Sequence, residues 1–173
     1  MIIRKEQPQD YEAIRRVNEE AFKGTVVEAD LIESIRTSDY YQPGLSLVAE
    51  AEDGLIVGYI MFSEISLEAA GRSRFILALA PLAVLPAYQG TRVGSRLMEE
   101  GIRLSREKAY PAIAVLGHAD YYPRFGFIPS EQFAIPAPFD VPAEYFMLLE
   151  LYDGSLENLA GTIHYPAAFS ENN

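Results

Sequence analysis

The stretch VLPAYQGTRVGSRLMEEGI, from Val84 to Ile102, contains a change of secondary structure. It begins as the end of an apolar strand and crosses a proline and two glycines. It then places Val93, Leu97 and Ile102 on one face of a helix. A helix N-terminus has unpaired amide N–H groups and a partial positive charge, so a glycine-bearing turn before it favours phosphate binding. The sequence therefore predicts a strand–turn–helix unit whose turn, Gln89 to Gly94, can hold a phosphate.

The residues of this turn leave two interpretations open. The turn lacks the Gly-Lys-Ser/Thr ending of a Walker loop and the three glycines of a dinucleotide fingerprint, which argues against nucleoside triphosphates and NAD. Glycines at a strand-to-helix turn are also explained by tight geometry alone.

Composition indicates one folded domain, residues 1–173. The chain has 173 residues, 49% of them hydrophobic, without a linker or repeat, and it has no cysteine and only two separated histidines, His118 and His164. A thiolate zinc site is therefore excluded, and we expect no metal centre. No segment approaches the length of a membrane span, so we expect a cytoplasmic protein without a membrane partner.

The charge balance indicates which partners to expect. There are 14 lysines and arginines against 25 aspartates and glutamates, a net charge of −11. This acidity argues against nucleic-acid binding and suits a cationic or amine-bearing partner.

Hydrophobic spacing and turn residues predict the remaining elements, with YYQPG as a loop before the second strand. The α/β core is the strand–helix–strand passage around the opening stretch. The predicted strands are Met1–Lys5, Leu45–Glu50, Leu55–Ile65, Arg74–Val84, Ala112–Leu116 and Tyr145–Tyr152, and helices are predicted from Pro8 to Gly24, around Val27–Ile35 and after Val93.

The longer stretch LAPLAVLPAYQGTRVGSRLMEEGI resembles the acetyl-CoA-binding segment of the GNAT superfamily of N-acetyltransferases, whose pattern is Val-x-Pro-x-x-Gln/Arg-x-x-Gly-x-Gly/Ala. Val84, Pro86, Gln89 and Gly94 match this pattern. Arg92 stands where the family has its first motif glycine. The Arg92 amide can still donate if its dihedrals are helical, and its guanidinium would add a charged contact to a CoA phosphate. We therefore expect weakened or re-aimed binding.

A second block, AVLGHADYYPRFGFIPS, resembles the family's later motif, in which a tyrosine precedes Gly-Phe by four residues. Tyr122 has that spacing to Gly126-Phe127. On its own, this block is typical of an aromatic core. The resemblance covers roughly Ile2 to Ile128 and is closest to a bacterial subgroup of predicted acetyltransferases.

The resemblance implies a mixed α/β fold. Its sheet is twisted and mostly antiparallel, has a central splayed strand pair, and carries helices on both faces. Acetyl-CoA would enter between the splayed strands as a cosubstrate, held by the backbone of one strand and by the phosphate turn. The residues implied in its binding are Leu82, Ala83, Val84, Gln89, Gly90, Thr91, Arg92, Val93, Gly94, Ser95 and Tyr122.

The implied reaction is attack of a primary amine of a small molecule or peptide on the acetyl carbon. Tyr122 is the expected acid for the departing CoA thiolate, rather than its neighbour Tyr121. Glu28 and Glu64 are the candidate bases, although for either carboxylate alone a solvated surface role is the more common one. His118 is an alternative relay, and a structural histidine by default.

Two other functions remain open. One is a catalytically silent CoA-binding regulatory module, which the Arg92 departure favours. The other is an interaction protein that uses the fold without CoA and pairs through its C-terminal strand as a homodimer.

Overall fold

A computed structural model describes residues 1–170, which form two compact units. Unit 1 comprises Met1–Ser63, Ala80–Leu104 and the segment from Ala167, and unit 2 comprises Glu64–Leu79 and Ser105–Pro166. Strands β3 (Ile56–Ala69) and β4 (Arg72–Val84) contribute a segment to each unit. The last three residues of the predicted domain lie outside the described part of the chain.

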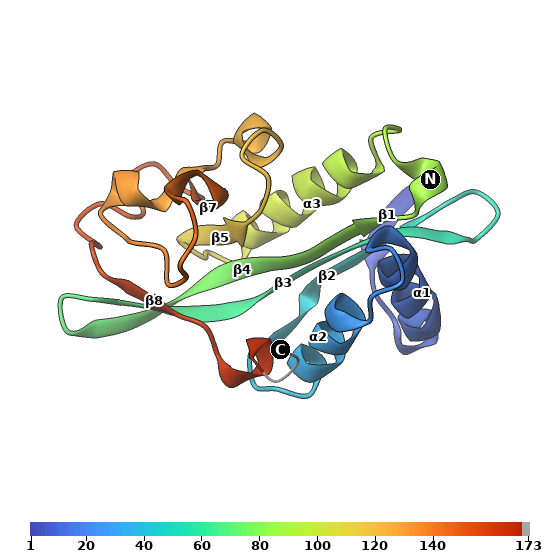
Figure 1. The fold of residues 1–173 in the computed structure, drawn as a ribbon, viewed down its shortest axis with the longest axis horizontal. Helices are drawn as coiled ribbons and strands as arrows, with labels where there is room; N and C mark the ends of the chain where they lie inside the picture. Colours follow the sequence, from blue (N-terminus) through green and yellow to red (C-terminus); the bar gives the residue numbers. More distant parts are fainter. Residues whose placement is uncertain (171–173) are drawn as a thin grey trace. The chain divides into compact units, whose positions relative to one another are not determined.

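The strands form one mixed, mostly antiparallel open sheet (Figure 1). Their hydrogen-bonded order is β1-β2-β3-β4-β5-β7-β6, and β8 pairs with β3. The β4–β5 ladder is parallel and consists of the pairs Leu77–Ile113 and Ala78–Ala114. This short ladder agrees with the predicted splayed strand pair. The remaining strands are β1 (Ile2–Lys5), β2 (Tyr41–Glu50), β5 (Ala112–Leu116), β6 (Ile128–Pro129), β7 (Phe146–Glu150) and β8 (Thr162–His164).

In unit 1, helices cover both faces of the sheet, as predicted. Helices α1 (Tyr11–Ala21) and α2 (Val27–Arg36) lie on one face and α3 (Val93–Glu107) on the other (Figure 1). Neighbouring strand residues point to opposite faces. Gly58 of β3 faces α3, and a Cβ there would lie 2.7 Å from Val93 Cγ1. The glycine therefore lets α3 lie close to the strand.

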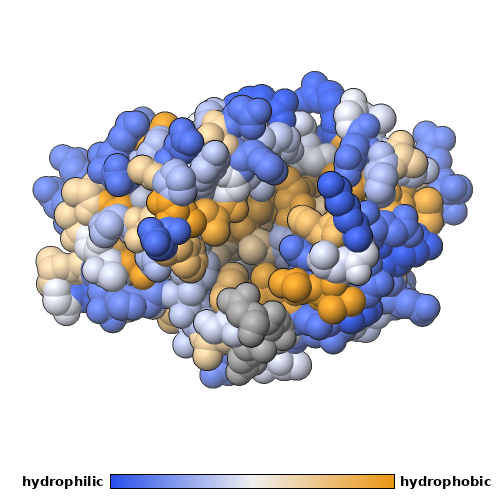
Figure 2. Space-filling model, viewed as in Figure 1, coloured by the Kyte–Doolittle hydropathy of each residue, from blue (hydrophilic) through white to orange (hydrophobic). Residues whose placement is uncertain are grey.

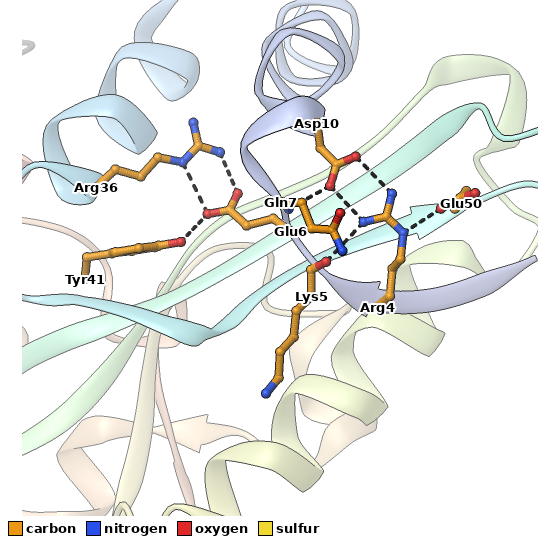
Figure 3. Close-up of polar contacts among 8 residues, drawn as sticks. All are labelled: Arg4, Lys5, Glu6, Gln7, Asp10, Arg36, Tyr41 and Glu50. Atoms are coloured by element: carbon orange, nitrogen blue, oxygen red, sulfur yellow. Dashed lines mark hydrogen bonds and ion pairs between the residues drawn. The ribbon is translucent and has the colours of Figure 1, made fainter.

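The end of β1 is tied to its neighbours by charge pairs (Figure 3). Glu6, whose side chain is 1% exposed, accepts hydrogen bonds from Arg36 Nη2 at 2.5 Å and from the Tyr41 hydroxyl at 2.5 Å. Arg4 donates two hydrogen bonds to Asp10, and these hold the pKa of the Asp10 carboxyl below its usual value. A buried carboxylate is tolerated only when it is paired, so these contacts fix α2 against β1 and β2.

In unit 2, β5 lies between β4 and β7, and 3-10 turns surround these strands. They are η3 (Tyr122–Phe125), η4 (Ser130–Phe133) and η5 (Ala143–Tyr145). Leu116 of β5 stands opposite Phe146 of β7. The amide of Gly117, the residue after β5, donates a hydrogen bond to the Tyr145 carbonyl. The loop after β5 is therefore held beside the start of β7.

The structure corrects several predicted boundaries. The loop predicted at YYQPG is wrong, because β2 already begins at Tyr41. Its register shifts between Tyr41 and Ser46, so Pro43 and Gly44 lie in an irregular strand segment where proline's missing N–H is tolerated. Strand β3 runs four residues past Ile65 to Ala69, and β6 and β8 were not predicted.

The surface is mainly hydrophilic on the face shown in Figure 2, with hydrophobic residues gathered in separate patches. No helix among residues 1–170 is long and apolar enough to cross a membrane. The exposed large hydrophobic residues are Ile2, Tyr11, Val26 and Val27 in unit 1, and Phe75, Leu116, Phe139, Tyr145 and Tyr152 in unit 2.

Candidate active site

The phosphate turn lies in unit 1, between β4 and α3. Helix α3 begins at Val93, and the Arg96 amide donates to the Arg92 carbonyl at 3.0 Å as the first helical hydrogen bond. The amides of Val93, Gly94 and Ser95 precede that bond and have no partner within the helix. The turn therefore presents consecutive N–H donors at the positive end of the helix dipole.

Two residues of the turn have left-handed backbone conformations. Gly90 has φ of +75° and Arg92 has φ of +69°. The dihedrals of Arg92 are therefore not helical, although we expected its amide to donate to a phosphate only if they were. The helix starts one residue later, at Val93. Glycine adopts a positive φ without strain, whereas a residue with a Cβ does not. The position that the GNAT pattern fills with glycine thus keeps a glycine-like conformation here with an arginine.

Side chains tie this turn to the end of β4. The Gln89 side-chain amide donates to the Val84 carbonyl at 3.2 Å, and the Thr91 hydroxyl donates to the Tyr88 carbonyl at 2.5 Å. Ala83 is buried, while Leu82 and Val84 are half-buried. The predicted cosubstrate-binding residues of unit 1, Leu82 to Ser95, thus form one continuous strand–turn–helix segment.

The Arg92 side chain points into solvent and has a carboxylate partner. Its guanidinium lies 3.2 Å from Glu99 Oε1, and the side chain is 73% exposed. An exposed ion pair of this kind is weak and breaks readily. The guanidinium is therefore free to exchange Glu99 for a phosphate.

The geometry of this segment suits a phosphate group. A Cβ placed on Gly90 would meet nothing within 4 Å, so the turn is open there. Helix-terminal amides bind phosphates well because they combine hydrogen-bond donors with a positive dipole. Residues Gly90 to Ser95 therefore combine open space with helix-terminal N–H donors, which a phosphate group needs.

Tyr122 lies in unit 2, at the start of η3. Its ring packs against Phe127, with ring centroids 5.8 Å apart, and against Gly117, where a Cβ would lie 2.4 Å from Tyr122 Cε2. Burial raises the pKa of Tyr122 to about 12, and the neighbouring Tyr121 adds to the shift. The phenol is therefore protonated throughout the neutral range, as a general acid must be.

Tyr121 occupies a different environment from Tyr122. The two rings are nearly perpendicular, at 88°, and their centroids are 5.1 Å apart. The Arg124 guanidinium lies 4.4 Å from the centre of the Tyr121 ring. The adjacent phenols thus face different neighbours, which makes Tyr121 a natural control for Tyr122.

Glu64, also in unit 2, is hydrogen-bonded rather than free. It accepts a hydrogen bond from the Tyr110 hydroxyl, which lies three residues after the end of α3. Burial raises the pKa of the Tyr110 phenol, and the bond to Glu64 raises it further. Sequence reasoning missed Tyr110, because two partners that are 46 positions apart leave no local signal.

Glu28 is half-buried in the first turn of α2 in unit 1, and its carboxylate accepts a hydrogen bond from the Thr25 hydroxyl at 2.9 Å. A carboxylate is stabilised there by the helix dipole.

His118 is exposed in the loop after β5. Unit 2 also has an open pocket of about 560 Å³ at η4, the end of β7 and residues 154–160, and none of the predicted site residues lines it.

Comparisons with known proteins show the family of this chain. Residues 42–129 match the family model described as an acetyltransferase (GNAT) domain. The chain is 42% identical over 137 residues to the uncharacterized N-acetyltransferase YjhQ of Escherichia coli K12, covering 79% of this chain and 75% of that protein. It is 29% identical to YhbS of the same strain, covering 98% of this chain and 99% of that one.

Two solved structures are similar along nearly the whole chain. The crystal structure of YhbS from Escherichia coli, in complex with CoA, has a TM-score of 0.90 at 28% identity and covers 99% of this chain and 93% of that one. A GNAT family acetyltransferase from Brucella melitensis, in complex with acetyl-CoA, has a TM-score of 0.76 at 34% identity, with 97% coverage of both chains. With a matching family model over half of its length and a close relative over most of it, this chain belongs to the GNAT family of acetyltransferases.

Proposed function

We propose that this protein transfers an acetyl group from acetyl-CoA to a primary amine of a small molecule or peptide by direct attack. The observation that carries the proposal is the open turn at the start of α3, with a left-handed Gly90 and consecutive first-turn amides that have no partner within the helix. The similar proteins solved with CoA and acetyl-CoA support the choice of cosubstrate.

Each part of the segment has a role in binding. The amides of Gly90 to Ser95 hold the pyrophosphate, and the backbone of Leu82, Ala83 and Val84 holds the pantetheine arm as an added strand would. The Val84 amide polarises the thioester carbonyl, because an N–H aimed at developing negative charge lowers the barrier. Gln89 keeps the strand end in place through its hydrogen bond to the Val84 carbonyl.

The proton balance assigns the remaining roles. The amine nitrogen bonds to the acetyl carbon while the carbon–sulfur bond breaks, and Tyr122 gives its phenolic proton to the departing thiolate. Its pKa of about 12 keeps the phenol protonated at neutral pH, and because a thiol is the stronger acid, the proton that the base takes from the amine must restore the phenol as sulfur is protonated. A base must remove one proton from the amine, and Glu28 and Glu64 are the proposed acceptors.

The direct test is acetyl transfer by the purified full chain. Acetyl-CoA and a panel of primary amines are supplied, and the acetylated amine is detected by mass spectrometry. A general acid contributes about 100-fold or more, so Tyr122→Phe is expected to lower kcat by about that factor. Tyr121→Phe, the matched control, should retain activity. Equal activity of both variants would remove Tyr122 from the mechanism.

The silent CoA-binding module is the second candidate, favoured by Arg92 at a glycine position. It predicts CoA binding without transfer to any amine of the panel. Acetyl-CoA binding together with an acetylated product would exclude it.

A further inference from the structure

We propose that Tyr121 is a positioning residue for Tyr122, and that Arg124 acts on Tyr122 through the Tyr121 ring. This inference rests on the proposed acetyl transfer, in which Tyr122 is the acid, and adds two residues that do not touch the reacting atoms. All three residues belong to unit 2.

The Tyr122 ring lies among three neighbours. A Cβ on Gly117 would lie 2.4 Å from Tyr122 Cε2, the Phe127 ring is 5.8 Å away, and the Tyr121 ring is 5.1 Å away at 88°. Aromatic rings favour this edge-to-face arrangement. Phe127 is 1% exposed, and the Gly117 amide is bonded to the Tyr145 carbonyl, so these two neighbours are fixed by the core of the unit. Tyr121 is only half-buried, so its position depends on its own contacts.

Arg124 contacts Tyr121 in two ways. The guanidinium carbon lies 4.4 Å from the centre of the Tyr121 ring, and the Arg124 Nε donates a hydrogen bond to the Tyr121 carbonyl at 3.2 Å. A guanidinium over a ring is attracted by the negative charge of the ring face. The Phe125 ring, 5.5 Å from that of Tyr121, adds a further contact. The Tyr121 ring is therefore held between Arg124 and Phe125 on its own turn and Tyr122 beside it.

The backbone of this turn is already constrained, so the neighbouring rings act mainly on the Tyr122 side chain. The Tyr121 amide donates to the His118 carbonyl at 3.2 Å, and the Arg124 amide donates to the Tyr121 carbonyl at 3.3 Å. Pro123 follows Tyr122 directly, and its ring fixes its own φ. What remains to be ordered is the rotation of the Tyr122 side chain about its χ angles. Contact with the Tyr121 ring restricts that rotation.

The position of the Tyr122 ring matters because a general acid must lie within hydrogen-bond reach of the atom that it protonates. A displacement of about 1 Å at a reacting centre lowers the rate by as much as about 100-fold. Tyr121 therefore affects kcat through the position of the Tyr122 hydroxyl. The role belongs to the Tyr121 ring and not to its hydroxyl, so Tyr121→Phe keeps it.

Steady-state kinetics with the full chain test the proposal. Acetyl-CoA and the most active primary amine of the panel are supplied, and release of the CoA thiol is measured. Tyr121→Ala removes the ring and should lower kcat by about tenfold with the KM for acetyl-CoA unchanged. Tyr121→Phe should restore most of that loss. Arg124→Ala should lower kcat by about two- to fivefold, the factor expected from one exposed contact between a guanidinium and a ring.

Two matched controls come from β4 of the same unit. Phe75 is 51% exposed and Arg74 is exposed. Phe75→Ala removes an exposed aromatic ring, and Arg74→Ala removes the same charge as Arg124→Ala. Both controls should keep the kcat of the wild type. Because Arg124 is itself exposed, Arg124→Ala tests the proposal in a folded protein even where Tyr121→Ala fails to fold.

Double variants separate positioning from a merely structural role. Once Tyr122→Phe has removed the acid, Tyr121→Ala has nothing left to position and should lower kcat no further. Arg124→Ala should likewise add nothing to Tyr121→Ala, because it acts through the ring that is already absent. A structural role would instead lower kcat by the same factor in each background.

The outcomes distinguish this inference from the function on which it rests. Equal kcat for Tyr121→Ala and Phe75→Ala, or a loss that persists in the Tyr122→Phe background, overturns the inference and leaves acetyl transfer standing. A raised KM for acetyl-CoA in Arg124→Ala also overturns it, because the guanidinium would then contact the cosubstrate directly. No turnover of any amine by the wild type overturns acetyl transfer, and the inference with it.

Discussion

Replacing Arg92 with glycine should separate the stability of the phosphate turn from its affinity for acetyl-CoA. Arg92 has φ of +69°, where a residue with a Cβ is strained by about 1–2 kcal/mol. Glycine removes that strain but adds about 0.5–1 kcal/mol of unfolded-state entropy. The lost ion pair with Glu99 is exposed and contributes about 0.5 kcal/mol or less. The free energy of unfolding of Arg92→Gly should therefore lie between about 0.5 kcal/mol below and about 1.5 kcal/mol above that of the wild type.

The affinity for acetyl-CoA should fall. A partly exposed guanidinium–phosphate contact is worth about 1 kcal/mol, so Arg92→Gly should bind acetyl-CoA about fivefold more weakly. Urea unfolding measures the stability, and isothermal titration calorimetry measures the affinity. Glu99→Gln is the companion variant, because it releases the guanidinium from its carboxylate and should leave affinity equal or higher.

Two results would refute this reasoning. A clearly less stable Arg92→Gly protein would mean that the left-handed arginine is not strained. Unchanged or tighter acetyl-CoA binding by that variant would mean that the Arg92 side chain makes no contact with the cosubstrate.

Four further changes should have measurable effects. Gly117→Ala forces the Tyr122 ring to move, because the new Cβ would lie 2.4 Å from Tyr122 Cε2. This displacement should lower kcat by about tenfold or more and leave the Kd for CoA unchanged. The pH profile of kcat should rise as the amine loses its proton and should not fall at any pH below about 10, since the pKa of Tyr122 is about 12; a fall centred near pH 8 would contradict its role as the acid. Glu6→Gln leaves an arginine buried without its charge partner and should cost about 3 kcal/mol in urea unfolding. The hydrogen bond from Arg4 lowers the pKa of Asp10 in the folded protein. The Arg4–Asp10 contact therefore stabilises the fold fully above the unfolded pKa of about 3.9, and this stabilisation is lost as the pH falls from there through the folded pKa. Asp10→Asn should therefore narrow the difference in free energy of unfolding between neutral and acid pH.

Periodic and uninterrupted patterns predicted their elements well. Helix α3 begins at Val93 and buries Leu97 and Met98 because those residues recur at helical spacing. Strand β5 has the predicted ends, Ala112 and Leu116, since a short apolar run bounded by turn residues has one simple interpretation.

Other elements carry no pattern that sequence reasoning can use. The two residues of β6 and three of β8 are too few to show alternation, and they pair only because tertiary contacts bring them to β7 and β3. The Pro43-Gly44 pair predicted a loop and instead lies in an irregular part of β2. Local turn chemistry was outweighed there by pairing along the rest of the strand.

The candidate site likewise contains features that the sequence could predict and features that it could not. The phosphate turn is local in sequence, so its position between β4 and α3 could be predicted, whereas the left-handed conformation of Arg92 could not. The contacts that define the unit 2 residues join distant parts of the chain, as with Tyr110 and Glu64. For Gly117, an isolated glycine shortly before two tyrosines was the available signal, and the close approach of the Tyr122 ring explains it.

The most direct test of acetyl-CoA binding at the α3 turn is the thermal unfolding midpoint as a function of acetyl-CoA concentration. A ligand present at about 100 times its Kd adds about 2.7 kcal/mol to the free energy of unfolding. For a chain of this size, the midpoint should then rise by about 5–10 °C. A midpoint that does not move up to about millimolar acetyl-CoA, where even a weak site would begin to fill, would contradict the account.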